Sequence, residues 1–265
     1  DAADSPRWTS WLYAWRNPHP ERRIVGLRLE PQNGVVLLAG VAYGFTQGHP
    51  LRWRARRKAL LRLPSDAAFD PTLDERGLLA QAQLDLGQVI SAQPRPIYLQ
   101  AAWGESYNNQ LPVISRQELL VEYTAHEEAR FHLADGSTVP VSEVENSRSS
   151  SIQPIAPATQ RVLLRVTERG SSAPLPVKLH VHGQAGEYLP PVDRHRIPNP
   201  AWFEDYSVDF THRGQHHCTY ISGEATLDLP LGPVYLEISK GFEIKPLHLR
   251  REITPDTREI RIEIE

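Results

Sequence analysis

The sequence predicts a mainly β protein with two β-sandwich-type units, the second of them immunoglobulin-like, and at most one or two short helices. Proline occurs 23 times in 265 residues, and it is tolerated at turns and strand edges rather than inside helices or central strands. The segments between prolines mostly alternate apolar and polar residues, which is the period of a half-buried strand. Turn dipeptides such as Asn33-Gly34 and Asp135-Gly136 separate successive segments.

Residues 156–265 form the more regular unit. Seven short alternating segments fall within about 105 residues, which is typical of an immunoglobulin-like sandwich. A long insertion at 184–215 interrupts them, and loops of this length in a compact domain are often functional. The expected strands are Arg161–Thr167, Val177–His182, Cys218–Ile221, Ala225–Leu229, Val234–Ser239, Leu247–Ile253 and Glu259–Ile264.

Residues 1–150 form a β-rich but irregular unit, and the Ser-, Pro- and Gln-rich stretch 145–159 is the best candidate for a linker. The best helix candidate is 70–91, because Asp70-Pro71 resembles an N-cap followed by proline at the first helical position. Alternatively, Leu86–Ser91 is a strand. The expected strands are 24–30, 35–41, 96–101, 118–124, 129–133 and 138–142.

The composition excludes several classes of protein. The 32 acidic residues outnumber the 29 basic ones, giving a net charge of −3, so binding to nucleic acid through bulk positive charge is excluded. No run of 18 apolar residues occurs, and no membrane span is expected. One cysteine, Cys218, cannot form an internal disulfide or a thiolate zinc site. This composition fits an extracellular or periplasmic protein, and the Asp1 start without any Met indicates a processed chain or a fragment.

The second unit resembles a known family. The hairpin S-G-E-A-T-L-D-L-P-L-G-P-V-Y-L-E-I-S-K-G-F-E at 222–243 is similar to a hairpin of the carboxypeptidase-regulatory-like, or transthyretin-like, β-sandwich. Residues 161–167 followed by 175–181 resemble the opening hairpin of that family. The resemblance covers about 160–265 and implies a transthyretin-like fold there.

Shorter segments suggest a more specific resemblance. H-V-H-G-Q-A-G-E-Y-L-P-P at 180–191 and K-G-F-E-I-K-P-L at 240–247 resemble the accessory N-terminal region of bacterial PHP-type, CehA/McbA-like metal-dependent hydrolases. This resemblance implies a catalytic domain elsewhere in the same polypeptide, and none of its metal ligands has a matching position here. The segment 15–29 is similar to the closing strands of a galactose-binding-like jelly roll, which implies a truncated jelly roll in the first unit.

Histidines make the first candidate site. His180 and His182 lie at alternate positions of an expected strand, so both face away from Val177, Leu179 and Val181. Together with His216 they could bind zinc or another divalent metal. The alternative is that they are polar residues on a solvated sheet face. Further candidate ligands near them are His212, His217, Glu187 and Asp193.

Aromatic residues make the second candidate site. Aromatic rings beside carboxylates and amides suit the recognition of a carbohydrate or polymer. The alternatives are a lid packed over the edge of the sandwich and, around 103–110, a long turn. The candidate binding residues are Tyr188, Trp202, Phe203 and Tyr206 in the insertion, and Trp103, Tyr107 and Asn108 in the first unit.

Two other features favour ordinary structural roles. Cys218 could share a strand face with His216, but it is better interpreted as a small buried apolar residue, and no catalytic residue is assigned. The basic run Arg52–Lys58 is interpreted as the guard of an edge strand rather than a grip for an acidic partner.

The functional expectation is a non-catalytic accessory or binding region of a secreted or periplasmic bacterial protein, whose missing catalytic domain is its partner. It would position modules of a metal-dependent hydrolase or bind glycans. One alternative is a structural module that self-assembles into homo-oligomers through exposed edges such as Glu259–Ile264. The second alternative is a small His-ligated metalloprotein.

Overall fold

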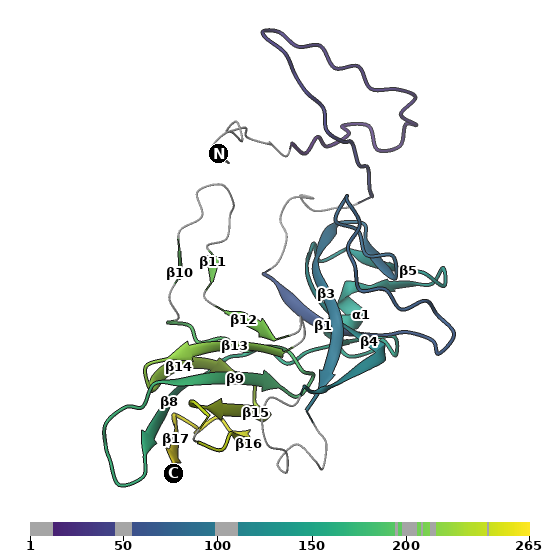
Figure 1. Ribbon diagram of the computed structural model, residues 1–265. Coiled ribbons are helices and arrows are strands. Elements are labelled where there is room, and N and C mark those ends of the chain that lie inside the picture. The colour runs from purple at the N-terminus through teal and green to yellow at the C-terminus, as the bar shows by residue number, and fades with distance from the viewer. Residues whose placement is uncertain are drawn as a thin grey trace.

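The structure is a computed structural model that describes residues 13–45, 55–98, 111–193, 196–197, 206–207, 209–212, 216–242 and 244–265. It is mainly β, with several antiparallel sheets and, among these residues, one short helix, α1 at Val141–Glu145. The described residues include no helix with the length and apolar character that a membrane crossing requires. Figure 1 shows a green and yellow β region beside a blue and teal one.

The C-terminal region consists of two sheets that face each other across an apolar core. The larger sheet has the order β12-β13-β9-β15-β16 and the smaller one the order β14-β8-β17. The larger sheet contains β9 (Val177–Gly183), β12 (Phe210–His212), β13 (His216–Ile221), β15 (Gly232–Ser239) and β16 (Leu247–Ile253). The smaller one contains β8 (Gln160–Glu168), β14 (Glu224–Leu229) and β17 (Glu259–Ile264).

Alternating side chains explain this sandwich. In β8, Val162, Leu164 and Val166 are fully buried, while the residues between them are partly exposed. β9 and β15 contribute the facing apolar side chains, including Leu179 and Leu236. All seven strands expected in 156–265 are present, within a residue or two at their ends. The period-2 pattern was sufficient here because each strand has one buried face.

The preceding region is built from two further sheets around a second core. One sheet has the order β3-β4-β1-β7 and the other has the order β2-β5-β6. Their strands are β1 (Arg57–Arg62), β2 (Ala82–Leu84), β3 (Gly87–Ile97), β4 (Val113–Ala125), β5 (Arg130–Leu133), β6 (Thr138–Pro140) and β7 (Ile152–Pro154). Tyr123 and Phe131 pack edge to face in this core. Two short two-residue strands, β10 (Arg196–Ile197) and β11 (Tyr206–Ser207), pair within the long insertion.

The helix predicted at 70–91 is wrong. Turns occupy its first part, with Gly77 at a φ of 75°, and β2 and the start of β3 occupy the rest. The alternative strand at Leu86–Ser91 is therefore the correct interpretation. Apolar residues of this segment, such as Leu79 and Val89, pack in the core of the sheets instead. The strand expected at 138–142 ends at Pro140, after which α1 begins.

The two strands expected at 24–30 and 35–41 are also wrong. The structure assigns no strand there, and side chains such as Val25 and Leu37 are at least 90% exposed. Two strands without a further sheet to pack on are marginal in water. The purple trace of 13–45 runs away from both β regions (Figure 1).

The described part of the basic run does not lie on an edge strand, so its interpretation as an edge guard is wrong there. β1 lies between β4 and β7, so Arg57 and Lys58 belong to an inner strand. Arg57 Nε lies 3.0 Å from Glu145 Oε1. Arg52 and Arg54 lie outside the described residues. β7 falls within the stretch predicted as a linker and pairs with β1.

Candidate functional site

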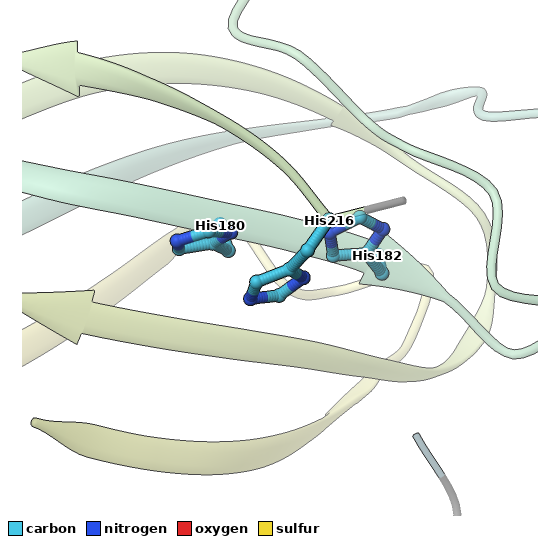
Figure 2. A group of neighbouring side chains, drawn as sticks. All are labelled: His180, His182 and His216. Atoms are coloured by element: carbon cyan, nitrogen blue, oxygen red, sulfur yellow. The ribbon is translucent and has the colours of Figure 1, made fainter. Parts of the chain in front are cut away.

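The three predicted metal-binding histidines come together on the outer face of the larger sheet of the C-terminal sandwich. His180 and His182 lie on β9, and His216 begins β13 (Figure 2). Ligand nitrogens of the three residues lie within 4.8 Å of one another. The rings of His180 and His216 stack with centroids 3.7 Å apart.

Strand register brings a carboxylate and a fourth histidine to the same face. In the β9–β15 pair, His180 is opposite Glu237 and His182 is opposite Tyr235. In the β15–β16 pair, Glu237 is opposite His248. Because directly opposite residues point to the same side of a sheet, His180, Glu237 and His248 form a row across three neighbouring strands.

Glu237 is the centre of this cluster. One of its oxygens, Oε2, lies 3.0 Å from His216 Nε2 and 3.3 Å from His248 Nε2. The other, Oε1, lies 3.8 Å from His180 Nε2. The side chains of Glu237 and of these three histidines are between 0 and 2% exposed. His182 is 1% exposed, so the interpretation of His180 and His182 as residues on a solvated face is wrong.

Backbone and tyrosine groups orient the rings. His180 Nδ1 lies 2.8 Å from the carbonyl oxygen of His217, and only a protonated nitrogen can bond to that acceptor. Nδ1 of His216 lies 3.0 Å from the Tyr98 hydroxyl. Both Nδ1 and Nε2 of His182 face carbonyl oxygens, at 3.4 Å from Gly186 and 3.2 Å from His217.

One nitrogen of His180 and one oxygen of Glu237 make no hydrogen bond in this cluster. His180 Nε2 and Glu237 Oε1 are buried and have no hydrogen-bond partner among the described residues. An unpaired buried polar atom costs about 1–3 kcal/mol, and such atoms point to an unexplained feature of a site. Here the two atoms face each other.

Burial controls the charge states in the cluster. Burial, with the nearby His216 adding to it, lowers the pKa of His180 to about 3. Burial also lowers the pKa of His182 well below its ordinary value. For Glu237, burial raises the pKa, but hydrogen bonds from His216 and His248 outweigh it and the net pKa is lowered. The site therefore holds an ionised Glu237 carboxylate beside the neutral imidazoles of His180 and His182.

The preceding β region closes the site. Tyr98, one residue past the end of β3, stacks on His182 with ring centroids 4.4 Å apart and on Tyr235 at 6.1 Å. Burial and the charge of Glu237 raise the pKa of the Tyr98 hydroxyl, which stays protonated. Arg95 Nη2 also donates to the carbonyl of Gln184 at 3.3 Å.

The carboxylates of Asp193 and Glu187, two of the further predicted ligands, do not join this cluster. Asp193 accepts from the backbone N–H of Thr226 at 3.1 and 3.2 Å. Glu187 is buried, which raises its pKa, and it accepts from the N–H of Ala185 at 3.0 Å. The carboxylate that does join, Glu237, was missed by sequence reasoning. A charged residue inside the otherwise apolar alternation of 234–239 was the available signal.

The predicted aromatic site is mostly outside the described residues, namely Trp202, Phe203, Trp103, Tyr107 and Asn108. Of Tyr206 only the backbone, in β11, is described. The Tyr188 ring packs on His217 at 5.3 Å and its hydroxyl donates to Asp209 Oδ1 at 2.9 Å.

Cys218 is buried, as interpreted from the sequence, and burial raises the pKa of its thiol. A raised pKa disfavours the nucleophilic thiolate. Within β13, His217 occupies a half-buried position between the buried His216 and Cys218.

Comparisons with known proteins add little to this geometry. No protein-family model and no curated protein matches the chain. Two crystal structures of BcpA, the major pilin subunit of Bacillus cereus, one of them a variant, are similar to it at 8% identity and a TM-score of 0.23. The matches cover 80 and 82% of this chain and 59 and 61% of the pilin chains, so this chain spans under two thirds of their length. A TM-score this low carries no argument about fold or function.

Proposed function

We propose that this chain is a non-catalytic positioning region of an exported bacterial protein, of the kind found beside PHP-type metal-dependent hydrolases. The observation that carries the proposal is the closure of the His–Glu cluster by Tyr98. A polar cluster that lies between two β units and is shielded from solvent suits a structural joint better than a reaction centre.

The burial of the cluster argues against turnover. His180, His182, His216 and Glu237 are all at most 2% exposed. A substrate site needs a concave opening that admits the ligand and buries it. Contacts that cross between the units serve instead to hold them: Tyr98 stacks on His182, and Lys58 Nζ donates to the carbonyl of Tyr188 at 3.5 Å.

The resemblance at 180–191 and 240–247 supplies the context for this role. Regions of that kind lie next to a catalytic domain and set its position. Carbohydrate or polymer binding through the aromatic residues of the insertion stays a prediction, and titration of tryptophan fluorescence with soluble oligosaccharides tests it.

Equilibrium unfolding tests the joint. We expect one cooperative transition for the unaltered chain, seen identically by far-UV circular dichroism and by tryptophan or tyrosine fluorescence. Tyr98→Ala is expected to split the transition in two, because it removes the side chain that links the units. Tyr13→Ala is the matched control, since Tyr13 is 85% exposed. Two separate transitions in the unaltered chain would contradict the proposal.

A hydrolysis assay tests the other half of the proposal. With nitrophenyl esters and phosphodiesters, added with Zn²⁺ or Mn²⁺, we expect the rate of buffer alone. Turnover that disappears in His216→Gln but persists in the exposed-residue variant His132→Gln would show that the cluster is catalytic.

Self-assembly is a second candidate function, favoured by the exposed apolar segment 24–41. Its apolar side chains Leu27, Leu29, Val35 and Leu37 are all more than 60% exposed, as in a strand that awaits a partner. Light scattering after size-exclusion chromatography tests it. A defined oligomer that Leu37→Ser dissociates would support assembly, and a monomer at high concentration would contradict it.

A further inference from the structure

We propose that His180, His216, His248 and Glu237 form a closed, structural binding site for one divalent transition-metal ion, Zn²⁺ above all. The ligand atoms are the Nε2 atoms of the three histidines and the carboxylate of Glu237. This inference is independent of the positioning function, since a metal can be held with or without a neighbouring catalytic domain.

The distances between Glu237 and the three histidine nitrogens fit one ion. Zn²⁺ binds imidazole nitrogen and carboxylate oxygen at about 2.0–2.2 Å, so neighbouring ligand atoms of a tetrahedral site are about 3.3 Å apart. The contacts that Glu237 makes with His216, His248 and His180 are 3.0, 3.3 and 3.8 Å, which brackets this value. The stacked rings of His180 and His216 must rotate about their Cβ–Cγ bonds to direct both nitrogens at the same ion.

The orientation of His180 favours metal binding in particular. Its Nδ1 donates to the carbonyl of His217 at 2.8 Å, and this arrangement is the common way in which proteins fix a metal-binding imidazole. The proton on Nδ1 leaves a lone pair on Nε2 when the ring is neutral. That lone pair faces Glu237.

An ion would resolve the unsatisfied pair. His180 Nε2 and Glu237 Oε1 both present lone pairs, are buried and lack a hydrogen-bond partner within the described chain. Two acceptors 3.8 Å apart repel each other in a region of low dielectric. A cation between them supplies the missing electrophile to both.

The remaining ligands have supporting contacts as well. The Tyr98 hydroxyl lies against Nδ1 of His216, where its oxygen can accept a hydrogen bond from the N–H that a metal-bound imidazole has on its outer nitrogen. His248 lies opposite Glu237 on the neighbouring strand. Three strands, β9, β15 and β16, and the start of β13 would thus be tied by one ion.

His182 is excluded from this ligand set although it lies in the same group. Its two ring nitrogens face the carbonyls of Gly186 and His217, so neither is directed at Glu237. We assign it a packing role beneath Tyr98. This assignment distinguishes the proposed set from one made only of the three histidines His180, His182 and His216.

The chemistry of the donors selects the metal. Imidazole nitrogen favours Zn²⁺, Co²⁺, Ni²⁺ and Cu²⁺ over Mg²⁺ and Ca²⁺, which prefer all-oxygen sites. Four protein ligands without an open position are typical of structural zinc sites rather than catalytic ones.

The experiment uses the full chain, stripped with a chelator and then titrated with Zn²⁺, Co²⁺ or Mg²⁺ alone. We expect one Zn²⁺ retained per chain after gel filtration, a higher melting temperature with Zn²⁺ but not with Mg²⁺, and the visible band of four-coordinate Co²⁺ at one equivalent. Glu237→Gln, His180→Gln and His248→Gln are expected to weaken Zn²⁺ binding by more than about 100-fold, beyond the 10- to 100-fold effect of losing an outer partner.

Two controls define the result. His126 is also buried but lies in the preceding β region, directly after β4. His126→Gln should therefore leave the Zn²⁺ affinity unchanged. His182→Gln should change affinity by less than about 10-fold. Loss of binding in His182→Gln with retention in Glu237→Gln would overturn the ligand set. If the substituted chains fail to fold, metal binding by the unaltered chain tests the site. A folded, unaltered chain that does not bind one equivalent of Co²⁺ or Zn²⁺ would overturn the proposal.

Discussion

The Tyr98 hydroxyl lies 3.0 Å from Nδ1 of His216, although 118 residues separate the two in the sequence. Tyr98 follows a strand of one β unit, and His216 begins a strand of the other. This contact joins the units at the point where the polar cluster would otherwise meet solvent. It also fixes the ring of a histidine that contacts the buried Glu237.

Removing only the hydroxyl should weaken this contact while keeping the ring stack on His182. We expect Tyr98→Phe to lower the free energy of unfolding by about 0.5–1.5 kcal/mol, the net value of a typical hydrogen bond. Chemical denaturation measures the change. Tyr13→Phe, at an exposed position, should have no effect beyond about 0.5 kcal/mol. Equal losses in both variants would show that the contact contributes nothing.

We expect a side chain at Gly186 to destabilise the fold at the contact with β3. Its φ is +88°, and a Cβ there would overlap the carbonyl oxygen of Pro96. Gly170 has a similar φ of +77° but open space around it. We therefore expect Gly170→Ala to cost about 1 kcal/mol for backbone strain alone, and Gly186→Ala to cost about 1–3 kcal/mol more.

Thermal and urea unfolding of the two alanine variants measure this difference. Because the backbone penalty is common to both, the difference reports the packing of Gly186 against Pro96. Equal destabilisation would mean that the two units separate at this point at little cost.

Gly183 and Glu187 should depend on each other. A Cβ on Gly183 would overlap the carboxylate of Glu187, which is buried and accepts from the N–H of Ala185. Gly183→Ala alone is expected to lower stability by about 1–3 kcal/mol through overpacking. When Glu187 is also replaced by Ala, the loss of unfolding free energy caused by Gly183→Ala should be at most half as large as it is in the chain that keeps Glu187.

A double-mutant cycle in urea measures this coupling. The Glu187→Ala single variant supplies the reference for the lost hydrogen bond. Additive effects of the two substitutions would show that Glu187 moves aside freely.

Glu118 should make stability sensitive to acid. Burial raises its pKa, but the hydrogen bonds and charges of Arg95, at 2.7 Å, and Arg62, at 3.0 Å, outweigh it and lower the pKa below 4.5. A carboxyl whose pKa is lower in the folded state stabilises above the unfolded pKa, and this contribution is lost as the pH falls through the folded value.

Stability curves of Glu118→Gln and of the unaltered chain should therefore differ by about 1 kcal/mol at pH 7, the upper value for partly exposed pairs. The difference should shrink as the pH falls below about 4.5. Glu75→Gln, at an exposed turn position, is the control. A difference that stays constant down to pH 3 would mean that packing, not charge, is responsible.

Local sequence pattern is sufficient to predict the strands of the C-terminal sandwich. In 259–264 each apolar residue alternates with a polar one, and in 161–167 every second residue is apolar and buried. This local pattern sets the strand and its buried face. The Asp135-Gly136 turn between β5 and β6 is equally local, with Gly136 at a φ of 82°. By the same alternation His180 and His182 were assigned to a shared face away from the core.

The residues that contact the face of His180 and His182 could not be predicted from local pattern. Glu237 and His248 reach His180 through the register of three strands, and register depends on pairing between distant segments rather than on local pattern. Tyr98 belongs to the other unit and stacks on His182. Its ring covers a sheet face for which the sequence allowed exposure to solvent, and the cluster is buried as a result. The segments 24–30 and 35–41 show the converse, because a strand pattern without a partner sheet does not become a strand.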